Sequence, residues 1–221
     1  MEGIDGCGKS TFVEGLAAAL RERGTDVVVT AEPTTTWLGD AVRRSWRESS
    51  GPAAEAYLFM ADRAVHCIEI ARQLEKGRTV ICDRYQDSTL VYQGSSMAKS
   101  FPGGLKGAMD WLASIAPPGL LRPDVTFLLE LAPESAMARM SGRASLTKFE
   151  RLSYLKGVHA AYQELGKDGR FATLDAKFAR GVVVSRAVSI LDKLKRGKAP
   201  TVKPAAGTRR RGRPARGIAR R

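Results

Sequence analysis

Long hydrophobic runs are missing from this sequence of 221 residues, and none approaches the roughly 18 apolar residues that a membrane-spanning helix needs. Cysteine is scarce: Cys7, Cys67 and Cys82 form no Cys-x-x-Cys pair and predict reduced thiols inside the cell. Histidine is scarcer still, and His66 and His159 alone make a histidine-based metal site improbable. We therefore expect a cytoplasmic protein with no membrane partner.

Acidic residues are missing from the C-terminal end. Residues 195–221 hold 11 of the 36 lysines and arginines and no acid, so most of the net charge of +13 lies there and the remaining chain carries only +2. This segment has almost no large apolar side chain to bury, and we expect it to be disordered. The sequence thus predicts one domain over 1–194 and a basic tail over 195–221.

The tail contains "RRRGRPARG", which resembles an AT-hook, a short segment that lies in the minor groove of A·T-rich DNA. A narrow minor groove has a strongly negative potential that attracts arginine, and counterion release makes such binding salt-sensitive. The alternative is a solvated basic extension with non-specific affinity for nucleic acid. DNA is thus an expected partner of the tail under either interpretation.

The first residues of the chain, "MEGIDGCGKSTF", contain the pattern G-x-x-x-x-G-K-[ST] of a phosphate-binding loop. Glycines allow the backbone to turn its N–H groups inward as an anion cradle, and the following helix directs its positive end to the same point. Lys9 can reach the β- and γ-phosphates, and the Ser10 hydroxyl can bind Mg²⁺. The alternative is a glycine-rich turn that caps a helix. The predicted cofactor-binding residues are Gly3, Asp5, Gly6, Cys7, Gly8, Lys9, Ser10 and Thr11.

Such a loop normally follows a buried parallel strand. A hydrophobic run of about five residues is expected before Glu2, and only Met1 stands there. We therefore expect the first strand to be missing from this chain, through a late start or a truncation, and we expect poor folding without it because its neighbours would be left unpaired.

The rest of the domain alternates strand and helix patterns, which predicts an α/β fold with a parallel sheet. Four segments predict strands: "DVVVTAEP", "RTVICDR", "PDVTFLLELAPE" and "RFATLDA". The predicted helices cover Thr11–Arg23, Leu38–Arg47, Pro52–Lys76, 87–98, 104–115, a segment from Pro133, Leu152–Gly166 and Arg180–Lys195.

Several motifs together resemble the thymidylate kinase family, in chain order and over residues 2 to about 192. They are "EGIDGCGKST", "EP" at 32–33, "YLFMADRAVH", "DRYQDSTLVYQG", and "TFLLELAPESAMARM" followed by a basic lid. The resemblance implies a P-loop NTPase three-layer fold, ATP as co-substrate with Mg²⁺, dTMP as acceptor and pairing as a homodimer. Departures from the pattern include Ala31 before "EP", Thr34 after it, Thr89, and Thr147-Lys148 in the lid.

Asp83 and Arg84 follow a predicted strand, at the sheet edge where parallel α/β folds bind ligands. A carboxylate there can hold Mg²⁺ together with Ser10, and a guanidinium can fork onto a phosphate. The resemblance implies that Arg84 binds the acceptor's phosphate. The alternative is an ion pair between Asp83 and Arg84.

The remaining acceptor residues come from the resemblance. It implies that Arg63 meets the thymine carbonyl edge and that Phe59, four residues earlier on the same helix face, stacks on the base. Phe59 alone would suggest a core residue. Asp5 is expected at the 3′-hydroxyl or as a turn former, while Tyr92 crowds the 2′ position. Ser88 is expected to line the site, Glu32 to position the acceptor or a metal-bound water, and Gln93 to cap or pack.

Phosphoryl transfer needs positive charge at the transition state, and the predicted catalytic residues are Lys9, Arg84 and Arg143. The family takes its mobile arginine from the phosphate loop or from the lid, and this loop offers only Gly6 and Cys7. The lid "GRASLTKFER" offers Arg143 first, then Lys148 and Arg151; a solvated loop charge is the alternative for Arg143.

The sequence thus favours an ATP-dependent dTMP kinase that serves dTTP synthesis. Two alternatives stay open. One is a kinase of another nucleoside or nucleotide, and the other is a degenerate kinase fold that binds DNA through its basic tail.

Overall fold

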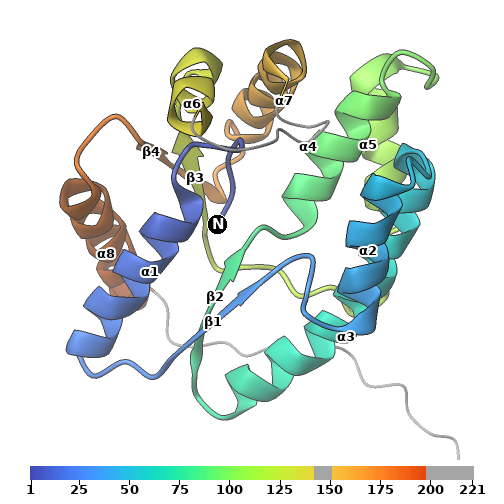
Figure 1. Cartoon of the computed structure of the whole chain (residues 1–221). Coiled ribbons are helices and arrows are strands. Elements are labelled where there is room, and N and C mark those ends of the chain that lie inside the picture. Colours follow the sequence, from blue (N-terminus) through green and yellow to red (C-terminus); the bar gives the residue numbers. More distant parts are fainter. Residues whose placement is uncertain (142–150, 198–221) are drawn as a thin grey trace, which may run out of the picture.

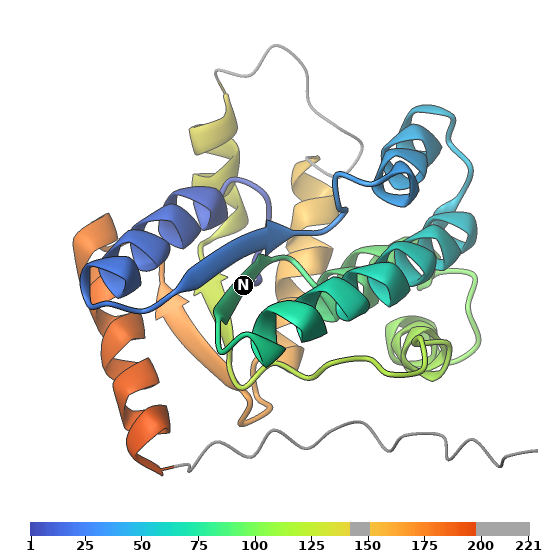
Figure 2. The ribbon, with the colours of Figure 1, turned by 90° about the horizontal axis from the view of Figure 1, so that it is seen from below.

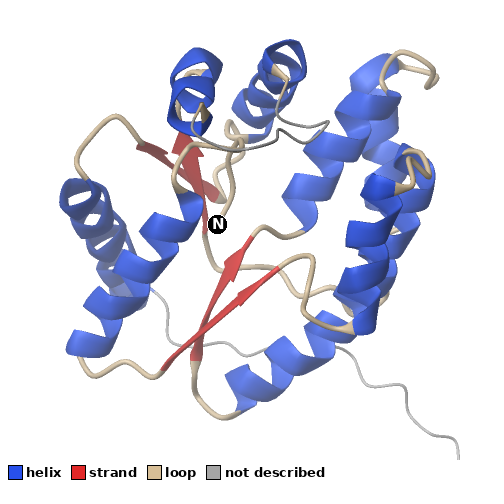
Figure 3. Cartoon of the chain, viewed as in Figure 1, coloured by secondary structure: helices blue, strands red, loops and turns tan. Residues whose placement is uncertain are grey.

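The structure, a computed structural model, describes residues 1–141 and 151–197. Its strands are β1 (Val27–Ala31), β2 (Thr79–Asp83), β3 (Thr126–Glu130) and β4 (Phe171–Asp175). All lie where the apolar runs predicted them, between helices that cover most of the chain (Figure 3).

The strands form two parallel pairs. In the first, Val27 of β1 lies opposite Thr79 of β2, and in the second, Thr126 of β3 lies opposite Phe171 of β4. Every residue of β3 except Glu130 is buried, as expected of a continuous apolar run in a sheet that is covered on both faces. The prediction of a parallel α/β arrangement is therefore confirmed.

Met1 and Glu2 lie between β2 and β3 and connect the two pairs. The nitrogen of Met1 donates to the Cys82 carbonyl at 2.9 Å, and the N–H of Arg84 donates to the Met1 carbonyl at 2.9 Å. The backbone of Glu2 exchanges two hydrogen bonds with β3, at 2.8 and 2.9 Å. Met1 and Glu2 thus occupy the position between β2 and β3 where the sequence predicted a central strand.

A groove continues the line of Met1 toward the amino ends of β2 and β3, with a volume of ≈ 1050 Å³ counting the space open to solvent. In a parallel strand, the N–H and C=O of one residue point to the same side. Thr79 and Asp83 bond toward β1, so Val80 between them turns its backbone groups toward this groove. We name it the sheet groove; Leu16, Leu20, Ile70, Leu74, Leu121, Val125 and Phe127 are among its lining residues.

Helices pack on both sides of the strands. Figures 1 and 2 show α1 and α8 side by side on one side, with α3, α4 and α5 on the other. The helices are α1 (Lys9–Glu22), α2 (Trp37–Arg47), α3 (Pro52–Glu75), α4 (Gln86–Met97), α5 (Gly104–Ser114), α6 (Pro133–Met140), α7 (Leu152–Leu165) and α8 (Arg180–Gly197).

Two helix ends differ from the prediction by two residues, and the other predicted ends lie within one residue of it. Helix α1 begins at Lys9 rather than Thr11, because Gly8 in the left-handed region forms its N-cap. Helix α8 continues to Gly197 rather than ending at Lys195, and the basic residues of its last turn are favourable next to the negative end of a helix.

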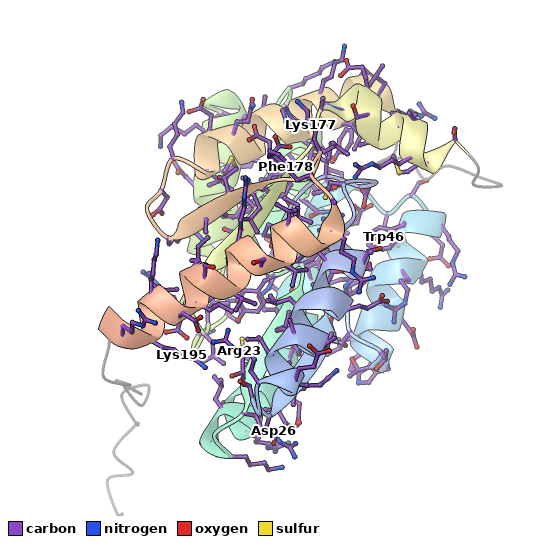
Figure 4. All side chains as sticks on the ribbon, turned by 90° about the vertical axis from the view of Figure 1, so that its left-hand side faces the viewer. Arg23, Asp26, Trp46, Lys177, Phe178 and Lys195 are labelled. Atoms are coloured by element: carbon purple, nitrogen blue, oxygen red, sulfur yellow. The ribbon has the colours of Figure 1, made fainter. Side chains whose placement is uncertain are left out.

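Packing of α1 and α8 closes one side of the core. Figure 4 views this side, with Arg23 and Lys195 near one end of the helix pair and Phe178 near the other. Arg23 pairs with Asp192 at 2.9 Å, and the Phe12 ring of α1 meets Phe127 of β3 edge-on, with centroids 6.1 Å apart. Among the described residues, no helix is long and apolar enough to cross a membrane.

Candidate active site

The glycine-rich loop between Glu2 and α1 has the geometry that its sequence predicts. Gly3, Gly6 and Gly8 have φ angles of 141°, 79° and 99°, a region that glycine adopts without steric cost. A Cβ on Gly6 would lie 2.5 Å from a carbonyl oxygen of α6. Lys9 is buried at the start of α1, and its Nζ donates to the carbonyls of Gly3 at 3.0 Å and Ile4 at 2.9 Å. A cation is thus held under the loop.

Cys7 and Thr11 complete the predicted cofactor-binding segment. The Cys7 side chain is buried, while its carbonyl accepts a hydrogen bond from Arg139 of α6 at 3.2 Å. Thr11 is exposed in the first turn of α1. Cys7 can therefore serve a ligand through its backbone, whereas Thr11 presents its side chain to solvent.

Ser10 and Asp83 come together across the loop and the end of β2. The Ser10 hydroxyl donates to Oδ2 of Asp83 at 3.2 Å. The other carboxylate oxygen, Oδ1, is buried and has no hydrogen-bond partner in the described part of the chain. A buried carboxylate oxygen without a donor beside a hydroxyl fits a divalent cation, which binds oxygen ligands of these types.

Arg84 lies at the centre of the site, immediately after β2, with a left-handed φ of 66°. It forms an ion pair with Asp5 rather than with Asp83, so the ion pair considered from the sequence is not formed. Its Nη1 donates to the Ser88 hydroxyl at 3.0 Å, and its guanidinium lies 4.9 Å from the centre of the Tyr92 ring. Two loops and α4 thus converge on one guanidinium.

Asp5 accepts hydrogen bonds at both carboxylate oxygens, from Arg84 and from the Tyr92 hydroxyl at 2.9 Å. Burial raises the pKa of Asp5, but the positive charges of Arg84 and Lys9 outweigh it and hold this pKa below its ordinary value. Burial also raises the pKa of Tyr92 well above its ordinary value, so its hydroxyl stays a proton donor.

A pocket of ≈ 710 Å³, counting the space open to solvent, lies beside this cluster. Every predicted acceptor residue except Arg63 lines it, and their convergence comes from four separate segments of the chain. The lining residues are Asp5, Glu32, Pro33, Trp46, Phe59, Arg84, Tyr85, Ser88, Tyr92 and Gln93.

Arg63 is placed differently from the prediction. Its side chain is 0% exposed and lies behind Glu32, whose Oε2 accepts from its Nε at 2.9 Å and its Nη2 at 2.6 Å. Nη2 also donates to the Thr89 hydroxyl of α4 at 2.9 Å. Phe59 instead faces the pocket, where its ring lies 6.2 Å from that of Trp46. Arg63 is therefore bonded to Glu32 and Thr89 and is not among the residues that line the pocket with Phe59.

The threonines that follow Pro33 are held by the residue next to Arg63. Asp62, 1% exposed on α3, accepts the backbone N–H of Thr34 at 2.8 Å, the Thr34 hydroxyl, and the Thr36 hydroxyl at 3.3 Å. Thr34, one of the departures from the family pattern, is thus held in place by its hydrogen bonds to the Asp62 carboxylate.

Glu2 is a site residue that the sequence reasoning missed. It is 1% exposed, and its carboxylate accepts from the backbone N–H of Tyr85 at 2.9 Å, the Ser88 hydroxyl at 2.6 Å and the Tyr162 hydroxyl at 2.7 Å. Burial raises its pKa, and the charge of Asp87 adds to this effect. Its place at the N-terminus of α4, next to Arg84, depends on long-range contacts that local sequence does not reveal.

Gln93 is a second residue that sequence reasoning did not assign to the site. We expected it to cap or pack, yet it lines the pocket and is 2% exposed. Its Nε2 donates to Glu55 at 3.3 Å, while Oε1 is buried with no hydrogen-bond partner among the described residues. The signal available in the sequence was its place next to Tyr92, on the helix that also carries Ser88.

Two predictions fall outside the described residues. Arg143 and Lys148 of the predicted lid belong to 142–150, and the AT-hook-like segment belongs to 198–221. Their proposed roles rest on the sequence alone.

Comparisons with known proteins point in one direction. The family model for thymidylate kinase matches residues 1–187. A probable thymidylate kinase of Methanospirillum hungatei is 40% identical over 178 residues, which is 79% of this chain and 84% of that protein. One of Methanosarcina barkeri is 37% identical over 180 residues (80% and 86%), and one of Halobacterium salinarum is 37% identical over 195 residues (86% and 93%).

Proposed function

The chain belongs to the thymidylate kinase family of nucleoside monophosphate kinases, and from that premise we propose that it transfers the γ-phosphoryl group of ATP to dTMP, giving dTDP and ADP. The observation that carries the proposal is the convergence of Lys9 and Arg84 at the carboxyl ends of the strands. Lys9 lies under the glycine-rich loop, and Arg84 lines the acceptor pocket. The chain thus has a place for two phosphate groups that must meet end to end.

The donor phosphates belong in the loop of Gly3 to Ser10. Its positive-φ glycines allow N–H groups to face one anion, and α1 directs its positive end there. Lys9 now holds two loop carbonyls and can exchange them for phosphate oxygens. Binding in the loop therefore needs no rearrangement of the core.

Ser10 and Asp83 would hold Mg²⁺, directly or through its waters, because their oxygens lie together and Oδ1 of Asp83 has no hydrogen-bond partner within residues 1–141 and 151–197. When bound, the ion would supply positive charge that neutralises the charge developing on the phosphate oxygens. The residues of the chain supply its oxygen ligands and the alignment of the loop with the acceptor pocket.

The acceptor belongs in the pocket beside Arg84. A guanidinium with donors in a fixed fork suits the acceptor's phosphate, and Asp5 and Tyr92 hold that fork in place. The thymine ring fits between Phe59 and the opposite wall. Oε1 of Gln93 has no hydrogen-bond donor in the described part of the chain, and the N3–H of thymine would be a matching donor. Cytosine has no hydrogen on that ring nitrogen.

A lid cation completes the proposal. The phosphate loop, Gly3 to Ser10, carries no arginine. We therefore assign the mobile positive charge at the transferred phosphoryl group to Arg143 of the lid, on sequence grounds. The cytoplasm, where Cys7, Cys67 and Cys82 stay reduced, is the compartment that we propose for the reaction.

A substrate panel tests the function. Wild-type protein is assayed with ATP, Mg²⁺ and each of dTMP, dUMP, dCMP, thymidine and dGMP, and dTMP is expected to give the highest kcat/KM. Failure to phosphorylate dTMP, or a clear preference for another acceptor, contradicts the proposal.

Arg84→Ala sharpens the same test. We expect kcat/KM for dTMP to fall by about 10³-fold, because the phosphate loses a charge-assisted fork. The matched control is Arg44→Ala, an exposed arginine that pairs with Glu48 on α2 away from the pocket. Equal activity of the two variants would remove Arg84 from the acceptor site.

We also propose that a second copy of the chain covers the outer face of α3. Tyr57, Val65 and Ile68 lie there at helical spacing and are 57%, 47% and 54% exposed. Exposed apolar stripes of this kind mark protein interfaces. Light scattering should give the mass of a dimer for the wild type and of a monomer for Ile68→Glu; a wild-type monomer contradicts the proposal.

A further inference from the structure

His66 has no role in the scheme above, yet it is one of the most enclosed polar side chains near the acceptor pocket. It lies on α3, one turn after Arg63, and is 5% exposed. Both ring nitrogens have partners: Nδ1 lies 2.9 Å from Oε1 of Glu32, and Nε2 lies 2.7 Å from the hydroxyl of Thr30 in β1. The imidazole therefore connects β1 to the loop that follows it.

Glu32 divides its carboxylate between two residues of α3. Oε2 accepts both hydrogen bonds from Arg63, and Oε1 accepts from His66. Both oxygens are thus bonded to α3 by side chains that are themselves buried. Removal of either partner would leave a buried carboxylate oxygen unpaired, which is costly in a region this enclosed.

For a neutral imidazole, the hydrogen bonds of His66 select one tautomer. Glu32 faces the charged Arg63 and acts as the acceptor, so Nδ1 of His66 carries a hydrogen and donates it to Oε1. Nε2 is then an acceptor, and the Thr30 hydroxyl donates to it. This is the less common imidazole tautomer, and only this chain of partners selects it.

We infer that His66 is a positioning residue for the base end of the acceptor pocket. By holding Oε1 it fixes the Glu32 carboxylate, and Glu32 in turn fixes Arg63, which donates to Thr89 on α4. Glu32 and Phe59 thereby keep their positions relative to α4, whose Tyr92 and Gln93 line the same pocket.

The effect is expected on acceptor affinity rather than on the transfer step. The hydrogen bonds of His66 go to Thr30 and Glu32 and not to Lys9, Asp5 or Arg84, the groups that we place at phosphate. This inference rests on the proposed function, because it concerns binding of a nucleotide acceptor.

Two substitutions separate the two ring nitrogens. In His66→Asn the amide nitrogen replaces Nδ1 and keeps the donor to Glu32, whereas in His66→Gln the amide replaces Nε2 and keeps only the contact with Thr30. We expect His66→Gln and His66→Ala to raise KM for dTMP about tenfold with kcat nearly unchanged. His66→Asn should stay close to the wild type.

His159→Asn is the matched control, since His159 on α7 is the other histidine of the chain and lies outside the acceptor pocket. It should leave KM unchanged. Equal KM values for wild type and His66→Gln, or a fall in kcat without a change in KM, would overturn the assignment. So would a His66→Asn variant as impaired as His66→Ala.

A measurement on the unmodified protein guards against variants that do not fold. Long-range ¹H–¹⁵N correlation spectra distinguish a protonated from an unprotonated ring nitrogen, and we expect Nδ1 protonated and Nε2 unprotonated for His66. The opposite tautomer would refute the network, whatever the assay shows. Wild-type protein that phosphorylates no dTMP would instead refute the proposed function and leave the tautomer result intact.

Discussion

The two ends of the same sheet are built very differently. At the carboxyl ends of the strands, buried polar groups form two hydrogen-bonded networks, one that joins Glu2 to Arg84 through Ser88 and one around Glu32. At the amino ends, β2 and β3 are separated by the sheet groove, and backbone groups such as those of Val80 face it. The site is therefore organised by contacts near Met1 and Glu2, whereas the opposite end depends on packing of the surrounding helices.

The contrast indicates that the strand pairs are aligned at the carboxyl ends of the strands, whereas the apolar packing that limits stability lies at the amino ends. Two residues with four backbone hydrogen bonds set the relative position of both strand pairs. They do so where the ligand pocket lies. The groove leaves apolar surface accessible, so it is expected to limit stability more than catalysis.

The largest effect on stability is expected from a substitution at the carboxyl ends of the strands, where Glu2 lies. Glu2→Ala removes the acceptor for Tyr85, Ser88 and Tyr162 and leaves their donors buried. We expect the free energy of unfolding to fall by about 3 kcal/mol and activity to be lost with it. Urea unfolding followed by circular dichroism measures the first quantity. The control is Glu14→Ala on the exposed face of α1; equal stability of the two variants would mean that Glu2 does not organise this end.

A smaller effect is expected from filling the groove. An extension of about five alternating valines and isoleucines before Met1 would supply a strand between β2 and β3 and bury the apolar lining. We expect a gain of about 2 kcal/mol, or about 6 °C in Tm, with KM for dTMP little changed. An equally long Gly/Ser extension is the control. Identical Tm values for both extensions would show that the groove does not accept a strand.

The smallest effect is expected on how steeply the free energy of unfolding changes with pH. The folded state raises the pKa of Glu2 above its ordinary value of 4.5, so the folded protein binds this proton more tightly than the unfolded chain does. Its contribution to stability is therefore full below pH 4.5 and declines as pH rises through the folded-state pKa.

Glu2→Gln has no such proton, so its stability should fall less between pH 4.5 and 7.5 than that of the wild type. Urea titrations at several pH values give the difference. A steeper decline in the variant than in the wild type would contradict the direction of the Glu2 shift. Asp5 is expected to act in the opposite sense, and below its ordinary pKa of 3.8, since its pKa is lowered.

Local patterns predicted the elements well. Strand β3 is a single apolar run, and α3 begins at Pro52, a favoured first position of a helix. The glycines of the phosphate loop have the positive φ angles that their spacing requires. Asp5, Glu32, Phe59, Arg84, Ser88 and Tyr92 lie in one pocket, while the roles assigned to them stay predictions.

Contacts between distant segments could not be predicted in the same way. The four-residue spacing of Phe59 and Arg63 gives their common helix face, but not the presence of Glu32 in front of the guanidinium. Glu2 and His66 become visible only when the strands bring their partners together. Sequence reasoning ranks a charged residue by its motif, whereas burial depends on what the fold places beside it.

Asp62 and Arg63 are consecutive residues of α3 that both bind the loop after β1. Asp62 accepts a hydrogen bond from Thr34, and Arg63 pairs with Glu32. Neighbouring positions on a helix point about 100° apart, so the loop sits in the angle between them. Substitution of Arg63 would leave the buried carboxylate of Glu32 without its guanidinium, and substitution of Asp62 would leave Thr34 without its acceptor. Exchange of the two residues would place a carboxylate beside Glu32. Tolerated changes at 62 and 63 should therefore come with compensating changes at 32 and 34, so that these four sites vary as a unit.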